Sequence, residues 1–268
     1  MLFLLLLVLH GKKITFLGKE YIIQELTTSS FDSKFDFAIF SADSSISKIF
    51  APIAASSGCI VIDNSSYFRM NPSVPLIVPE VNPEEIQNHN GIIANPNCST
   101  IQAVCSLKPL DTAYSIKRIV YSTYQAVSGA GYKGVLDLES GMESYMCSGK
   151  INTNYELQKF PLPIFSNCLP HIDTFTDNGY TKEEEKMINE TRKILKKPYL
   201  KITATTVRVP VLNSHSESIN VEFEKDFNLK ELKQILANSS GIIVKDDFEN
   251  EIYPTTLDSS RSRCYFCR

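Results

Sequence analysis

A cysteine stands where the sequence predicts a helix to begin. Residues 91–102 read GIIANPNCSTIQ, so Cys98 follows an Asn-Pro-Asn turn and opens a predicted helix over 98–110. Asn97 can cap this helix, and the free N–H groups of a first turn favour a thiolate and lower the pKa of a thiol. We therefore interpret Cys98 as a nucleophile. A half-buried, inert cysteine is the alternative that position alone leaves open.

A nucleophilic cysteine is usually activated by a general base, and the chain has four histidines. We favour His215, because it lies at the bend between two predicted strands. His10 and His89 fall in expected surface turns, and His171 lies in an irregular segment. The alternative for His215 is an ordinary surface or core histidine whose ring is satisfied by its neighbours.

A glycine pattern follows the predicted strand 116–127. SGAGYKG matches G-x-G-x-x-G through Gly129, Gly131 and Gly134, which is the spacing of a dinucleotide-binding loop. Such loops open a domain at its first strand, whereas this one lies in the middle of the chain. We therefore interpret it as a tight turn that lets the backbone approach a ligand.

Several basic residues are candidates for binding anions. Arg208 lies inside the apolar strand VRVPV, where an unpaired charge would be costly, so we expect it to meet a carboxylate of the protein or of a ligand. Arg69, Arg192 and Lys193 are further candidates. Solvated or internally paired charges are the alternative for each of them.

The composition is that of a globular protein. The 268 residues are 43% hydrophobic and 21% charged, the net charge is −3, and the basic residues are scattered, which argues against nucleic-acid binding. Seven cysteines at irregular spacing indicate reduced thiols in a cytosol-like compartment. Cys264 and Cys267 have metal-ligand spacing, but a zinc site needs a second pair of ligands, so we expect no metal. The apolar run Leu2–Leu9 is too short to span a bilayer, and we predict a buried parallel strand there.

The order of predicted elements indicates two domains. The first half alternates strands and a helix, as in an open α/β sheet, and the second half is α+β from about residue 98. Thr181 and Glu184 form a capping box at the start of the clearest helix. The predicted elements are a hairpin in KKITFLGKEYII, buried strands at 35–42 and 59–64, strands at 116–127, within 201–225 and in GIIVKD, and helices at 48–57, 134–145, 181–195 and 229–237.

Taken together, these segments resemble the aspartate-semialdehyde dehydrogenase family. The resemblance runs from about Gly11 to Asp258 and rests on DNSSYFRM, VPLIVPEVNPE, GIIANPNCSTIQ, STYQAVSGAG, NGYTKEEEKMINETRKI and TTVRVPVLNSHSESINVEFE. It implies an α/β fold like that of glyceraldehyde-3-phosphate dehydrogenase. The implied parts are a truncated Rossmann-like NADP-binding domain over 1–97, an α+β substrate-binding and dimerisation domain over 98–245, and a remnant of the return to the cofactor domain over 246–268.

The resemblance implies an activity and the residues that carry it. The implied reaction is NADP-dependent reductive dephosphorylation of 4-aspartyl phosphate to L-aspartate 4-semialdehyde, in lysine, methionine and threonine biosynthesis. Cys98 would form the acyl thioester, His215 would be the acid/base, and Gln125 would orient the substrate near the sulfur. A homodimer or homotetramer is implied as well, in the cytoplasm, or in a plastid for a plant-like source, with no nucleic acid and no membrane.

The resemblance also assigns binding residues. Glu190 would meet the substrate's amino group and Arg208 its carboxylate. Arg69 and Lys193 would hold the phosphate with Asn97 close by, and Arg192 is a rival to Lys193. For the cofactor NADP, the implied contacts are Ser128, Gly129, Ser41 and Ala42.

The sequence departs from the family's pattern in the cofactor domain. The family begins with a G-x-x-G-x-x-G loop that cradles the cofactor phosphates, and this chain has no such segment. At residues 41–45 the chain has SADSS where the family has Ser-Ala-Gly-Gly, so Asp43 adds a negative charge there. After residue 260 the chain has RSRCYFCR, where the family continues with a strand and a long helix. We therefore weigh a second function, a non-catalytic fragment or paralogue that keeps the substrate domain and oligomer surface without binding NADP. A third, an N-acetyl-glutamyl-phosphate reductase, fits less well because Glu190 suits a free amino group.

Overall fold

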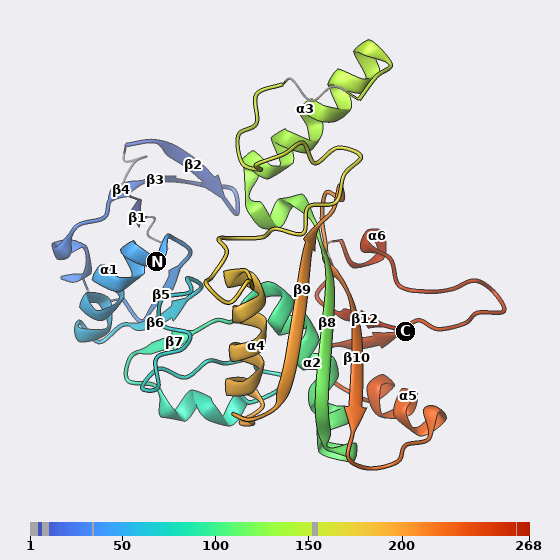
Figure 1. Ribbon diagram of the computed structural model, residues 1–268. Helices are drawn as coiled ribbons and strands as arrows, with labels where there is room; N and C mark the ends of the chain where they lie inside the picture. The colour runs from blue at the N-terminus through green and yellow to red at the C-terminus, as the bar shows by residue number, and fades with distance from the viewer. Residues whose placement is uncertain (1–4, 7–10, 34, 152–154, 261) are drawn as a thin grey trace. The chain divides into compact units, whose positions relative to one another are not determined.

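The chain divides into two compact units, which we describe separately. The computed structural model describes residues 5–6, 11–33, 35–151, 155–260 and 262–268 (Figure 1). The first unit comprises Met1–Ile77 and Glu84–Asn95, and the second comprises Val78–Pro83 and Pro96–Arg268. In the described residues, no helix has both the length and the apolar character needed to cross a membrane.

The first unit is built on a parallel sheet with a helix against it. The strand order is β5-β6-β7, with β5 at Phe37–Phe40, β6 at Ile60–Asp63 and β7 at Ile92–Ala94. Helix α1 (Ser44–Ser56) connects β5 to β6 and packs on β6, which is the expected alternation of strand, helix and strand. Asp63, buried at the end of β6, accepts a 2.8 Å hydrogen bond from Ser47 Oγ and so fastens α1 to the sheet.

Strand β5 corrects one prediction. The segment 35–42 does form a strand, but we expected it to be buried, and the side chains of Phe37 and Ile39 are 65% and 78% exposed. The reason is its position at the edge of the β5-β6-β7 order, which no local sequence pattern reveals.

The predicted hairpin is confirmed. Strands β2 (Lys13–Phe16) and β3 (Lys19–Ile22) pair antiparallel across Leu17 and Gly18, whose φ angles of 49° and 74° suit a tight two-residue turn. Of the apolar run Leu2–Leu9, the structure describes only β1 (Leu5–Leu6), which pairs parallel with β4 (Gln24–Glu25); the rest of the predicted strand lies outside the described residues. A short 3₁₀ helix, η1, follows at Thr28–Phe31.

The second unit is built on a three-stranded sheet of order β10-β8-β9. Strand β8 (Ile116–Gln125) pairs parallel with β9 (Lys201–Arg208) and antiparallel with β10 (Ser216–Phe223), as the predicted strands required. Helices α2 (Cys98–Tyr114) and α4 (Lys182–Ile194) pack against this sheet (Figure 1). Alternate residues of β8 are buried as a result. These are Ile119, Tyr121, Thr123 and Gln125.

The caps that begin these two helices are those that the sequence predicts. Asn97 Oδ1 accepts the N–H groups of Ser99 and Thr100 at the start of α2. At the start of α4, the Glu184 carboxylate accepts the backbone N–H of Thr181, and the Thr181 hydroxyl accepts the backbone N–H of Glu184. Both starts are therefore fixed locally, and each carries residues of the site described below.

The remaining elements complete the second unit. The two helices predicted at 134–145 and 229–237 are present, the first of them longer than expected. Strand β12 pairs parallel with β11, so the end of the chain packs within this unit. The elements are η3 (Val127–Ala130), α3 (Tyr132–Ser148), α5 (Leu229–Ala237), β11 (Ile242–Val244), α6 (Thr256–Ser259) and β12 (Tyr265–Cys267), while η2 (Pro83–Asn88) spans the boundary between the units.

Candidate active site

The structure brings the two predicted reactive residues together. Cys98 is the first residue of α2, and His215 lies just before β10, after a Ser214 whose φ angle is 69°. Cys98 Sγ and His215 Nε2 are 3.4 Å apart, within hydrogen-bonding reach for sulfur. The two residues are 117 positions apart in the sequence, so this contact depends on how α2 packs against the sheet.

The backbone fixes which ring nitrogen of His215 carries its proton. The Ala126 N–H donates to His215 Nδ1 over 3.0 Å, so the neutral ring is protonated on Nε2, the nitrogen that faces sulfur. Burial, and then the positive charge of Arg208, lower the pKa of His215 to about 4, and Glu183 opposes them. At neutral pH the imidazole is therefore uncharged and donates its Nε2–H toward Cys98.

The thiol of Cys98 does not have the lowered pKa that its position at a helix start predicts. Cys98 keeps exposed surface, but the surrounding protein desolvates the sulfur. Desolvation and then the negative charge of Glu183 raise the pKa of Cys98, against the Ser99 N–H and Arg208. The lowered pKa expected for this thiol is therefore not found in the resting site.

A buried carboxylate from α4 faces the reactive pair. Glu183 Oε1 accepts hydrogen bonds from Asn97 Nδ2 over 2.9 Å and from Gln125 Nε2 over 3.2 Å. Glu183 thereby joins the residue before Cys98 to the last residue of β8, the predicted orienting residue Gln125. Sequence analysis missed Glu183.

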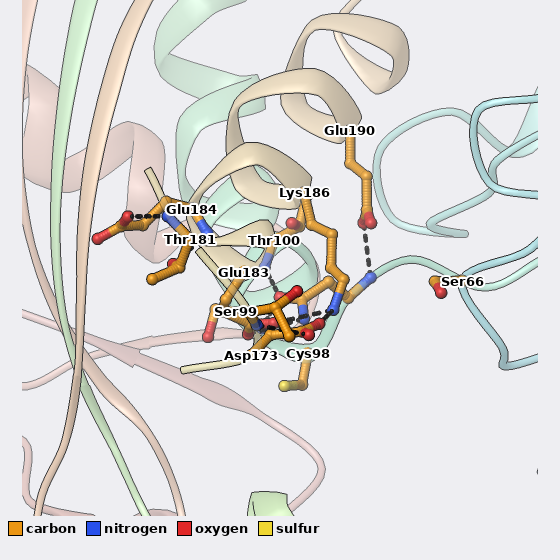
Figure 2. Close-up of polar contacts among 12 residues, drawn as sticks. Ser66, Cys98, Ser99, Thr100, Asp173, Thr181, Glu183, Glu184, Lys186 and Glu190 are labelled. Carbon is orange, nitrogen blue, oxygen red and sulfur yellow. Dashed lines mark hydrogen bonds and ion pairs between the residues drawn. The ribbon is translucent and has the colours of Figure 1, made fainter. Parts of the chain in front are cut away.

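A lysine lies beside this carboxylate. Lys186 Nζ is 2.7 Å from Asp173 Oδ2 and 3.4 Å from Glu183 Oε2. Figure 2 shows these three side chains gathered close to Cys98. The paired carboxylates raise the pKa of Lys186 despite its partial burial, so its ammonium is charged. Sequence analysis missed Lys186 as well.

Glu190, the carboxylate that sequence analysis placed in the site, has another contact. It is 1% exposed, and its Oε2 accepts the backbone N–H of Asn97 over 2.7 Å (Figure 2). Glu183 and Glu190 are two helical turns apart and share one face of α4, so the helical pattern alone does not distinguish them. The signal that favours Glu183 is its place in the first turn.

The two basic residues expected on α4 are also placed by the structure. Arg192 donates from Nε to the Leu200 carbonyl over 3.0 Å, and Lys193 lies in the last turn of the helix. On the same helix, Lys186 contacts Glu183.

Arg208 ends β9 at the wall of the same site. It is 5% exposed and donates from Nη1 to the Ala126 carbonyl over 2.6 Å. Its Nε is buried without a hydrogen-bond partner in the described part of the chain. A buried guanidinium with an unused donor suits an anionic ligand group, which agrees with the carboxylate expected opposite this strand.

The glycine turn lies against His215 and Arg208. A Cβ on Gly129 would lie 2.8 Å from His215 Cε1 and 3.1 Å from Arg208 Nη1, so a larger residue would displace these two side chains. Ser128, in the same 3₁₀ helix η3, donates its N–H to the Leu212 carbonyl over 3.2 Å.

Three of the predicted site residues, Arg69, Ser41 and Ala42, belong to the first unit. Arg69 is buried and donates from Nη2 to the Asn64 carbonyl over 2.9 Å. Ser41 and Ala42 follow β5, and Asp43 is the N-cap residue of α1 without a side-chain capping hydrogen bond. A carboxylate at this helix start disfavours a phosphate there.

Two family patterns match this chain. The one described as "Semialdehyde dehydrogenase, NAD binding domain" matches residues 8–89, and "Semialdehyde dehydrogenase, dimerisation domain" matches residues 107–268.

Individual proteins match over most of the chain. An aspartate-semialdehyde dehydrogenase of Aquifex aeolicus is 51% identical over 92% of this chain and 73% of its own length. That of Bacillus subtilis is 44% identical over 93% and 73%, respectively. The crystal structure of aspartate semialdehyde dehydrogenase II from Vibrio cholerae superposes with a TM-score of 0.88 at 42% identity, covering 95% of this chain and 75% of that chain. A second structure of the latter, complexed with ASA, gives a TM-score of 0.87 at 41% identity over 95% and 74%.

Proposed function

The chain belongs to the aspartate-semialdehyde dehydrogenase family, and we propose that it catalyses the NADP-dependent reductive dephosphorylation of 4-aspartyl phosphate to L-aspartate 4-semialdehyde. The observation that carries the proposal is the 3.4 Å contact between Cys98 Sγ and His215 Nε2. By resemblance, the reaction serves lysine, methionine and threonine biosynthesis in the cytoplasm.

The proposed chemistry begins at the sulfur of Cys98. The exposed thiol first loses its proton to solvent, and the thiolate attacks the acyl carbon of the substrate. The C–S bond forms and the C–O bond to phosphate breaks, which leaves a thioester and free phosphate. When NADPH is bound, it would supply the hydride that reduces the thioester carbon. The Nε2–H of His215 is placed to donate to oxygen that becomes negative at that carbon, and the thiolate then leaves as the aldehyde forms.

The substrate is proposed to be bound by charged groups of the same site. Arg208, with its unused buried Nε donor, would bind the α-carboxylate. Glu183 would meet the amino group, in place of Glu190, because it is the α4 carboxylate that contacts Asn97 Nδ2 beside Cys98. Lys186 would bind the phosphate in place of Lys193. Arg69, in the first unit, stays a predicted phosphate ligand. Charges at both ends of a substrate hold its carbonyl in a reactive geometry.

The residues present fit one end of a dinucleotide. At Gly129 the backbone lies close to His215 and Arg208, and Ser128 and Gly129 would hold the nicotinamide there. Ser41 and Ala42, after β5, are the proposed contacts in the first unit. Asp43 at the start of α1 does not suit the pyrophosphate. This last observation favours the second candidate function, a protein that binds substrate and phosphate without NADP.

NADPH formation from aspartate semialdehyde, NADP and phosphate tests the proposal. We expect phosphate-dependent turnover that Cys98→Ala abolishes. Cys168→Ala is the matched control, because Cys168 is also an exposed free cysteine and should be dispensable. Absence of turnover in a folded protein that still binds phosphate would reject the dehydrogenase and support the second candidate.

The second unit is proposed to form a homodimer, since residues 107–268 match a dimerisation domain. Light scattering on the purified chain tests this, and a monomer mass at micromolar concentration would contradict it.

A further inference from the structure

A buried carboxyl group that the proposed mechanism does not use lies next to the reactive pair. Glu217 is in β10, two residues after His215, and faces Thr123 of β8 in the register. Its Oε1 accepts a 2.6 Å hydrogen bond from Gln102 Nε2. Its Oε2 is buried and has no hydrogen-bond partner among the residues that the structure describes.

The two ends of this hydrogen bond belong to the elements that carry the reactive atoms. Gln102 follows Cys98 by four residues on α2, which places it one turn further along the same face. Glu217 is the second residue of β10, and His215 lies just before that strand. The Gln102–Glu217 contact therefore joins α2 to the start of β10, close in sequence to the contact between Cys98 and His215.

Keeping a carboxyl group in this place is costly. Burial, and then the negative charge of Glu183 from α4, raise the pKa of Glu217 to about 8, against the Gln102 hydrogen bond. Tyr121 of β8 is another titratable group nearby: burial raises its pKa, and the charge of Glu217 raises it further. A neutral aliphatic side chain would avoid this cost, so the acid points to a role that packing alone does not supply.

We propose that the Gln102–Glu217 hydrogen bond is a positioning contact that holds His215 Nε2 at hydrogen-bonding distance from Cys98 Sγ. Neither residue touches the proposed substrate; both act through the pair. The Ala126 N–H holds the other ring nitrogen of His215. In the proposal, the Gln102–Glu217 contact adds the spacing between α2 and the start of β10. The importance of this distance for turnover rests on the proposed function, but the distance itself can be probed without substrate.

Alkylation of Cys98 by iodoacetamide, followed by peptide mass spectrometry at pH 7, is the test. The reagent reacts with thiolate, which the Nε2–H stabilises, and a lost charge-assisted hydrogen bond corresponds to a rate about tenfold lower. We expect Glu217→Leu and Gln102→Leu each to slow Cys98 by that factor. The double variant should be no slower than either, because the two residues act as one unit. Glu217→Gln, which keeps an oxygen acceptor for Gln102, should restore most of the rate.

The exposed Cys147 and Cys168 of the same samples are internal controls, and their rates should not change. Unchanged Cys98 rates in both leucine variants would overturn the proposal, as would additive losses in the double variant. A Glu217→Gln variant as slow as Glu217→Leu would also overturn it, since the carboxyl group and not the hydrogen bond would then matter. Because no substrate or cofactor is present, a chain that never turns over still gives a decisive answer.

Discussion

At the scale of single residues, the resting site pairs a neutral thiol with a neutral imidazole. The pKa of Cys98 is raised and that of His215 is lowered to about 4, which is the reverse of a preformed thiolate and imidazolium pair. Glu183 contributes to the first shift through its negative charge. A substrate ammonium beside Glu183 would offset that charge, so we expect substrate binding itself to favour the thiolate.

Glu183→Gln should make Cys98 more reactive in the absence of substrate. Removing the carboxylate removes the charge that raises the pKa of Cys98, so alkylation at pH 7 should become several-fold faster. The measurement is the second-order rate with iodoacetamide between pH 6 and 10. Glu185→Gln on the same helix is the control, and a slower or unchanged rate in Glu183→Gln would contradict the electrostatic argument.

The raised pKa of Glu217 predicts a stability that depends on pH. Its pKa is about 8 in the folded chain against an ordinary 4.5, so the unfolded chain releases this proton first and stability is lost as pH rises from 4.5 to 8. Glu217→Gln has no proton to lose, and it should be more stable than the parent at pH 8, by on the order of 4 kcal/mol at most, and equal to it at pH 4.

Urea unfolding at the two pH values measures this difference. Glu222→Gln, which removes an exposed carboxylate that pairs with Arg118, is the control and should show no such gain. A Glu217→Gln variant with the same advantage at both pH values would show that its effect does not arise from ionisation.

At the scale of elements, the start of α4 determines where Glu183 and Lys186 lie. The capping box fixes this start, and Thr181 is 1% exposed within it. Thr181→Ala should cost about 1–2 kcal/mol of stability and should lower kcat, because Glu183 loses its fixed helical position. Chemical unfolding and steady-state kinetics measure the two effects.

Thr255→Ala is the matched control for that substitution. Thr255 caps α6 with the same kind of box, but α6 has only four residues and contributes no residue to the site. The Thr255→Ala substitution should therefore leave kcat unchanged. A similar kcat decrease in both variants would assign the effect of Thr181→Ala to general destabilisation.

Elements with strong local signals were predictable from the sequence. The capping box of α4, the Asn97 cap of α2 and the strands of the β10-β8-β9 sheet lie where the sequence places them, because caps and alternation depend on near neighbours in the chain.

Features set by packing between distant segments were not predictable. The choice between Glu183 and Glu190 depends on where Asn97 meets α4, and the exposure of β5 depends on its edge position. The raised pKa of Cys98 depends on desolvation and on a carboxylate 85 positions away in the chain, and these outweigh the helix-start effect that the local sequence suggests.

At the scale of the whole molecule, the chain passes between its two units three times. Val78–Pro83 belongs to the second unit, although the segments on both sides of it belong to the first. Val78 and Val81 of this segment are 1% and 6% exposed. The second unit therefore depends on a piece of chain that precedes its main segment.

A comparison of two fragments tests this dependence. A fragment over 78–268 should be more stable than one over 96–268, because only the first retains the buried valines, and a lost buried valine costs on the order of 1–3 kcal/mol. Thermal unfolding by circular dichroism measures the difference. Equal midpoints would show that the segment contributes nothing to the second unit.

Because the chain crosses three times between its two units, few positions are suitable for recombining this protein with a relative. A gene fusion or a natural crossover with one joint, placed between Asn95 and Pro96, would separate Val78–Pro83 from the body that it completes. To exchange one whole unit with that of a relative, the two chains must be joined at all three crossings, after residues 77, 83 and 95. Recombination at a single joint should therefore succeed only between relatives whose 78–83 segments are interchangeable, so the two units are expected to be inherited together.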